Sequence, residues 1–150
     1  MLLAIKKAEV GIARGQTPFG ACIVKNGKVI SCEHNIVWSA SDITAHAEIT
    51  AIRQGCIKLK TIDLSGSVIY STCEPCPMCF SACHWAKISR IVYGASIADA
   101  ENHGFNELNI SNKQLKQAGK SEIKLVGGVL KQKNIDLFKK WSALSDRRVY

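Results

Sequence analysis

The chain has 150 residues, of which 47% are hydrophobic and 21% charged, as expected for one globular domain with a proper core. No apolar run approaches the roughly 20 residues that a membrane helix needs, and the first segment lacks the pattern of a secretory signal peptide. We therefore expect a single domain over residues 1–150 in the reducing cytoplasm, away from membranes. The odd count of seven cysteines also argues against full disulfide pairing.

The net charge of +8 is concentrated near the C-terminus. Residues 113–150 carry ten Lys/Arg against three Asp/Glu, whereas residues 1–112 carry ten against nine. Such a basic region is typical either of a nucleic-acid-binding surface or of the solvated face of a terminal helix. The charge alone does not choose between the two.

A helix and a hairpin are expected first. Residues 2–13 predict an amphipathic helix, because Leu2, Ile5 and Ile12 recur about a turn apart. The segment "FGACIVKNGKVISC" predicts a β-hairpin, because Asn26-Gly27 between two apolar runs is the preferred pair of a type I′ turn.

Helices and strands then alternate. "THAEITAIRQGCIKLK" predicts a helix with Thr44 as its N-cap, and "SVIYST" a short buried strand. "CPMCFSACHWAK" predicts a second helix with Pro77 near its first position, and "RIVYGA" another strand. We expect a loop over 99–110, a strand over 123–127 and a helix over 130–144 whose inward side chains are Leu130, Ile135, Phe138 and Trp141.

This order predicts an α/β fold: a three-layer α/β/α sandwich with a central mixed five-stranded sheet. The hairpin supplies an antiparallel pair, and the crossover helices should make the later strands parallel.

The most informative residues open the two crossover helices. The first helix carries His46 and Glu48 in its opening turn, and the second carries Cys76 and Cys79 three residues apart. One imidazole and two thiolates fill three tetrahedral positions around Zn²⁺ and leave the fourth for water, as in catalytic zinc sites. Glu48 is then placed to transfer a proton without binding the metal. His-x-Glu followed by Pro-Cys-x-x-Cys is the signature of zinc nucleobase deaminases.

Other interpretations of "STCEPCPMCFSACHW" explain less. A closed zinc knuckle with Cys73 as fourth ligand leaves Glu48 without a role, and an iron–sulfur site would need Cys83. A disulfide cluster conflicts with a reducing compartment, and a thioredoxin-like pair explains neither His46 nor Glu48. The remaining cysteines are interpreted as small buried hydrophobic residues: Cys22, Cys32, Cys56 and Cys83.

The chain resembles the cytidine deaminase-like zinc hydrolases, and within them the bacterial guanine deaminases. "TPFGACIVKNGKVI", "THAEITAIRQ" and "YSTCEPCPMCFSACHWA" are shared with bacterial tRNA adenosine deaminases, whereas "DAENHGFNEL", the "HWA" of the second metal helix and the terminal tyrosine are similar to the guanine branch. The resemblance implies a homodimer, with C-terminal segments exchanged between subunits in that branch, and one Zn²⁺ per subunit with water or hydroxide as fourth ligand.

The resemblance also implies roles for single residues. Glu48 would shuttle the proton, and Glu107 would recognise the base and assist proton transfer, at a position where a relative carries aspartate. The other implied substrate contacts are Asn35, Phe19, the main chain near Ala47 and Cys76, and Tyr150; the implied zinc ligands are His46, Cys76 and Cys79. Each substrate contact has a plainer alternative: Asn35 as a turn cap, Phe19 as core, Glu107 in a solvated acidic loop and Tyr150 as a disordered end.

We therefore expect a zinc-dependent hydrolase that converts a small purine base, guanine to xanthine, and releases ammonia. One alternative is a tRNA wobble-adenosine deaminase that forms inosine. The basic C-terminal region favours this alternative, and the acidic loop around Glu107 disfavours it. Another alternative is a deaminase of another nucleoside or heterocyclic amine. A structural zinc module that binds nucleic acid or protein is the non-enzymatic alternative.

Overall fold

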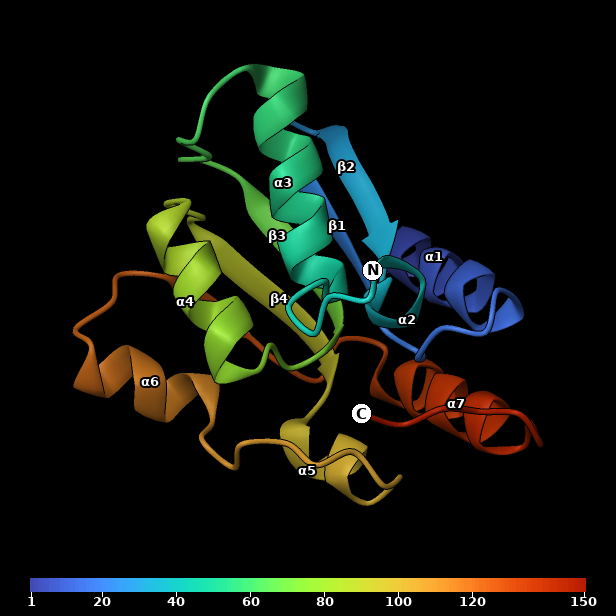
Figure 1. Ribbon diagram of the computed structural model, residues 1–150. Helices are drawn as coiled ribbons and strands as arrows, with labels where there is room; N and C mark the ends of the chain where they lie inside the picture. Colours follow the sequence, from blue (N-terminus) through green and yellow to red (C-terminus); the bar gives the residue numbers. More distant parts are fainter.

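A five-stranded mixed sheet forms the centre of the computed structural model, which describes residues 1–150 (Figure 1). Its order is β2-β1-β3-β4-β5. Strand β1 runs antiparallel to both β2 and β3, whereas β3, β4 and β5 are mutually parallel. The predicted fold class is confirmed. The strands are β1 (Gly20–Lys25), β2 (Lys28–His34), β3 (Val68–Cys73), β4 (Arg90–Ala95) and β5 (Lys124–Val126).

Two pairs of long helices cover the two faces of the sheet (Figure 1). Helices α3 (Ala47–Leu59) and α4 (Pro77–Trp85) pack on one face around a cluster that includes Ile69 and Ile91. Helices α1 (Leu2–Ala13) and α7 (Lys131–Ser142) pack on the other face around a second cluster. Its largest side chains are Phe138 and Trp141. None of the helices is long and apolar enough to cross a membrane.

The predicted hairpin has the predicted turn. Asn26 and Gly27 both have positive φ, 50° and 73°, as a type I′ turn requires. Cys22 lies directly opposite Cys32 in the register of β1 and β2, and the two are joined as a disulfide. Of the two expected small buried residues, Cys22 is buried and Cys32 is half-buried, and their pairing was not predicted. Opposite positions of a hairpin bring such side chains into contact.

Three short helices lie in the connections: α2 (Val37–Ala40), α5 (Ile97–Glu101) and α6 (Asn112–Ala118). The start of the predicted loop 99–110 is thus helical, and α6 was not predicted. Both α5 and α6 open with a capping box, Ser96 with Asp99 and Ser111 with Gln114. This Ser-x-x-Asp/Gln spacing is the sequence signal that would have located them.

Two details of the long helices also differ from prediction. Helix α3 is capped by His46 rather than by Thr44, whose hydroxyl donates to the Asp42 carboxylate at 2.6 Å. At the start of α7, Leu130 is 40% exposed, while Leu137 takes the inward position.

Candidate active site

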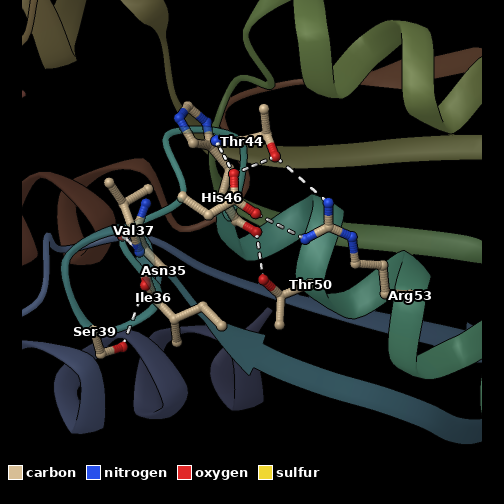
Figure 2. Close-up of polar contacts among 9 residues, drawn as sticks. Asn35, Ile36, Val37, Ser39, Thr44, His46, Thr50 and Arg53 are labelled. Atoms are coloured by element: carbon tan, nitrogen blue, oxygen red, sulfur yellow. Dashed lines mark hydrogen bonds and ion pairs between the residues drawn. The ribbon is translucent and has the colours of Figure 1, made fainter.

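The expected metal ligands lie at equivalent places in two helices. His46 is the N-cap of α3 and Cys76 the N-cap of α4, and both have extended backbones with ψ of 159° and 167°. The side chain of Thr50 donates to the His46 carbonyl at 2.9 Å, which fixes the start of α3 (Figure 2). Cys79 follows one turn into α4 and is fully buried.

The structure brings these three residues together. Their ligand atoms all lie within 4.8 Å of one another. The His46 Nδ1 atom is 3.7 Å from the Cys76 sulfur and 3.6 Å from the Cys79 sulfur. This cluster contains one imidazole and two thiols, and no carboxylate belongs to it.

The electrostatics of the cluster favour a bound cation. A hydrogen bond with Cys79, and further contacts with His46, lower the pKa of Cys76 to about 4, against burial that would raise it. The same hydrogen bond, together with burial, raises the pKa of Cys79. A bound metal would displace the thiol protons, because ligating thiols are deprotonated.

A small inner cavity adjoins the cluster. It has a volume of about 10 Å³ and is lined by residues that include His46, Cys76, Glu48 and Glu107. A space of this size holds about one water molecule. The donor set and the adjoining polar space therefore fit zinc with an open position, as in catalytic rather than structural sites.

Glu48 is a buried carboxyl group beside the cluster. Only 5% of the residue is exposed. The Ser71 hydroxyl donates to its Oε1 at 2.7 Å, and the Cys79 thiol donates to its Oε2 at 3.5 Å. Burial raises the pKa of Glu48. A carboxyl group held in place with a raised pKa is suited to transferring a proton near neutral pH.

A larger outer cavity of about 290 Å³ opens next to the same residues. Its lining includes His46, Cys76, Phe105, Glu107 and Tyr150. This volume lies near the lower end of small-molecule sites and suits one heterocyclic ring system. Glu107 lines both cavities, and burial together with the neighbouring Cys76 raises its pKa to about 7.

The C-terminal tyrosine lies over Asn35. The Asn35 Nδ2 group donates to the Tyr150 hydroxyl at 2.7 Å. Asn35 Oδ1 accepts from the Val37 N–H at 3.0 Å (Figure 2). Asn35 is fully buried, and the Tyr150 and His46 rings are 5.7 Å apart. Any molecule that reaches the Asn35 side chain must first displace Tyr150.

The other expected substrate contacts divide into two groups. Phe19 lines the inner cavity and packs edge-on against Phe105, with ring centroids 4.8 Å apart. Ala47 is buried as the first residue of α3, and it lines neither the inner nor the outer cavity. Asn35 also lines neither cavity, because the Tyr150 side chain covers Asn35.

Among the cavity-lining residues that sequence reasoning missed, Glu74 and Phe105 carry a recognisable signal. Glu74 lines the inner cavity and is 8% exposed, and Phe105 lines the outer one. The signal for Glu74 is an acidic residue between a buried strand and the ligand-bearing turn, where an unpaired charge would be costly. The signal for Phe105 is an apolar ring within an otherwise polar loop.

A histidine and two cysteines at two helix N-termini, beside a buried glutamic acid on a mixed α/β sheet, define the zinc-dependent hydrolytic deaminases. The chain belongs to the cytidine deaminase family: residues 1–95 match the family described as the cytidine and deoxycytidylate deaminase zinc-binding region.

Two kinds of relative share this sequence pattern. The chain is 37% identical over 148 residues to a guanine deaminase of Bacillus subtilis, covering 99% of this chain and 92% of the relative. It is 41% identical over 93 residues to a tRNA-specific adenosine deaminase of Aquifex aeolicus, covering 62% of each chain. The second similarity thus spans a smaller part of the protein.

Solved structures of both kinds are also similar. A guanine deaminase from Nitrosomonas europaea superimposes with a TM-score of 0.87 at 27% identity, covering 94% of this chain and 81% of that one. A tRNA:A34 deaminase gives a TM-score of 0.80 at 30% identity, covering 91% and 96%. The fold is therefore common to both, and the substrate must be argued from the site.

Proposed function

We propose that this protein is a zinc-dependent hydrolase that converts guanine to xanthine and ammonia, with one zinc ion per subunit. The observation that carries the proposal is the position of Glu107, whose carboxyl group lines both the inner cavity beside the metal ligands and the outer cavity. The match to the Bacillus subtilis guanine deaminase along 99% of this chain supports it.

Glu107 fits guanine better than adenine. Guanine presents two hydrogen-bond donors side by side, N1–H and the 2-amino group, and an ionised carboxylate accepts both. Adenine presents an acceptor at N1 and no 2-amino group, so a partly buried carboxylate would be left unpaired. Polar mismatches of this kind can discriminate by roughly 10⁴ or more.

The residues have separate tasks in this proposal. His46, Cys76 and Cys79 would hold zinc, which when bound supplies a water acidified to a pKa of roughly 7. Glu48 takes one proton from the nucleophile with Oε2, while Ser71 holds Oε1, and delivers it to the ring nitrogen. It then takes the second proton, from the hydroxyl now on carbon, and delivers it to the leaving amine. A C2–O bond forms, the bond from C2 to the exocyclic 2-amino nitrogen breaks, and ammonia leaves.

A homodimer, with or without exchanged C-terminal segments, is the assembly that we propose for this enzyme. Within one chain Tyr150 already reaches the site, where its hydroxyl meets Asn35. In an exchanged dimer the partner's C-terminal tail, residues 143–150 after α7, would take this place. Mixing two inactive variants, one altered at Glu48 and one lacking the tail, would restore activity only if tails are exchanged.

The competing function is deamination of the wobble adenosine of tRNA. It is favoured by the basic C-terminal region and by the similarity to tRNA-specific adenosine deaminases. The deciding experiment is ammonia release from guanine, guanosine, adenine, cytosine and a tRNA anticodon hairpin. Turnover of guanine alone is the expected result, and turnover of the hairpin alone would overturn the proposed substrate.

A Glu107 series refines the same experiment. Glu107→Gln keeps one acceptor and adds a donor, so guanine turnover should fall by about 10² or more, while the affinity for adenine changes less. Glu107→Asp keeps the charge and should retain most of the preference for guanine. An equal loss of activity on all substrates in both variants would contradict the proposed role of Glu107.

A further inference from the structure

Glu74 is a buried carboxylate that the proposed chemistry does not use. It precedes Cys76 by two residues and follows the end of β3. Its Oε1 accepts from the Asn112 N–H at 2.8 Å, and its Oε2 accepts from the Ile97 N–H at 3.4 Å. Both of its oxygens are thus committed to main-chain donors of other segments.

These two donors mark the ends of one stretch of chain. Ile97 is the first residue of α5, and Asn112 is the first residue of α6. Between them lie residues 105–108, which form one wall of the outer cavity and include Phe105 and Glu107. The Glu74 carboxylate therefore binds both ends of the segment that carries Glu107 through hydrogen bonds.

A reciprocal contact joins the same two parts of the protein. The Asn112 side chain is fully buried and donates to the Pro75 carbonyl at 2.5 Å. The Glu74 N–H in turn donates to the Ala95 carbonyl at 2.8 Å, at the end of β4. The turn that presents Cys76 and the segment that presents Glu107 are therefore connected by a closed set of buried hydrogen bonds.

An ionised carboxylate suits this junction for a chemical reason. It offers an acceptor to each of two N–H groups, and charge-assisted hydrogen bonds are about twice as strong as neutral ones. A glutamine of the same shape offers one acceptor, and its NH₂ group would face the second N–H. A buried donor without an acceptor is costly, so one end of the segment would be released.

We propose that Glu74 is a positioning residue that fixes Glu107 relative to the metal ligands, and that it thereby sets the affinity and preference for the base. The consequence for the base rests on the proposed function, because it requires Glu107 to contact the substrate. The consequence for the segment 97–112 does not, and it can be measured without any substrate.

The test uses the full-length zinc-loaded protein with Glu74→Gln, Glu74→Asp and Asn112→Ala, and Glu101→Gln as the control. Glu101 ends α5 within the same segment and is exposed. Hydrogen exchange in peptides covering residues 97–112 should accelerate by about tenfold or more in Glu74→Gln, with zinc content unchanged. Glu101→Gln should exchange as wild type does.

Kinetics then test the link to the base. In Glu74→Gln we expect KM for guanine to rise by about tenfold or more, kcat to change less, and the preference for guanine over adenine to fall. Asn112→Ala should act in the same direction, and the effects of the two substitutions should not add, because both act on one junction. Glu74→Asp, which keeps the charge, should recover part of the loss.

Several outcomes would overturn the inference. Unchanged exchange over 97–112 in Glu74→Gln would do so, as would a loss of kcat with unchanged KM. Loss of zinc in both Glu74→Gln and Asn112→Ala would show that the junction supports Cys76 rather than Glu107. If exchange over 97–112 accelerates in Glu74→Gln but the wild-type protein does not deaminate guanine, the junction is established and only the proposed function is refuted.

Discussion

Glu48 is the residue on which the proposed chemistry depends most directly. It lies against Ser71 and Cys79 and outside the group of atoms that could bind a metal. Glu48→Gln keeps the shape of the side chain and removes its ability to transfer a proton. We expect zinc content to stay at the wild-type level while ammonia release falls by roughly 10² to 10⁴ or more.

The exposed Glu122 provides a matched control, because Glu122→Gln removes a carboxylate that belongs neither to the cluster nor to the lining of the two site cavities. Zinc content is measured by metal analysis and turnover by ammonia release on the same samples. Wild-type turnover in Glu48→Gln would rule out the proton-transfer role. Loss of zinc in that variant would instead make Glu48 part of the metal site.

The environment of Glu107 predicts a dependence of stability on pH. Burial raises its pKa from 4.5 to about 7 in the folded protein, so the folded state binds this proton more tightly than the unfolded state does. The contribution of Glu107 to stability is therefore full below pH ~4.5 and is lost as the pH rises toward ~7. The Glu107→Gln protein has no ionisable group at this position, so its stability lacks this dependence on pH.

Thermal unfolding of zinc-free protein at several pH values between 4 and 8 measures this effect. The difference in Tm between Glu107→Gln and wild type should shift in favour of the variant as the pH rises through that window. Taking the difference removes the contributions of the other titrating groups. A difference that stays constant across the window would show that the Glu107 pKa is not raised.

Short-range patterns predicted the chemistry of the site, and long-range contacts completed it. The spacings of His46 with Glu48 and of Cys76 with Cys79 are local, so the sequence indicated a metal-ligating set that the structure brings within 4.8 Å. The hydrogen bond between Asn35 and Tyr150 joins residues that are 115 positions apart, and no local sequence pattern encodes such a contact. The two bonds of Glu74 depend in the same way on tertiary packing.

Elements with a strong periodic signal were predicted almost to the residue. Strand β4 and helix α1 coincide with the expected ranges, because continuous apolar runs and a regular apolar face are unambiguous. The N-cap of α3 was predicted to be Thr44 but is His46, because the Thr44 hydroxyl is hydrogen-bonded to the Asp42 carboxylate. Competition between nearby acceptors for one hydroxyl is not readable from propensity alone.

The C-terminal tail is the element that must move if a base reaches Asn35. The Trp38 Nε1 group donates to the Arg148 carbonyl at 3.2 Å, and the Arg148 guanidinium lies 4.7 Å above the Trp38 ring. Trp38 therefore reports the position of the tail. Adding guanine to the Glu48→Gln protein should change the tryptophan emission, because the tail contacts of Trp38 are broken.

Trp38→Phe in the same background identifies the source of the signal. Trp85 and Trp141 remain in that variant, and Trp141 lies in the core next to Phe105, with ring centroids 4.9 Å apart. The emission change on adding guanine should disappear with Trp38. An equal change without Trp38 would assign the signal to Phe105 and Trp141, and the tail would then not be the moving element.

At the scale of the whole molecule, part of the positive charge gathers away from the candidate site. Lys113, Lys116, Lys120 and Lys124 line two adjoining depressions on α6 and β5, and these share no residue with the two site cavities. The ion pairs of the chain involve other basic residues. A neutral base bound in the site cavities would not contact these lysines, whereas a polyanion such as tRNA could bind to them.

The two substrates predict opposite responses to salt. Guanine is uncharged, so kcat/KM for guanine should change by less than about twofold between 50 and 200 mM salt, because no counterions are released. A tRNA hairpin held by several lysines would instead lose affinity by about 10² or more over the same range. Lys116→Gln together with Lys120→Gln should leave the guanine reaction unchanged and flatten any salt dependence measured with the hairpin. Turnover that falls steeply with salt and depends on these two lysines would make the basic face part of substrate binding and favour RNA over the free base.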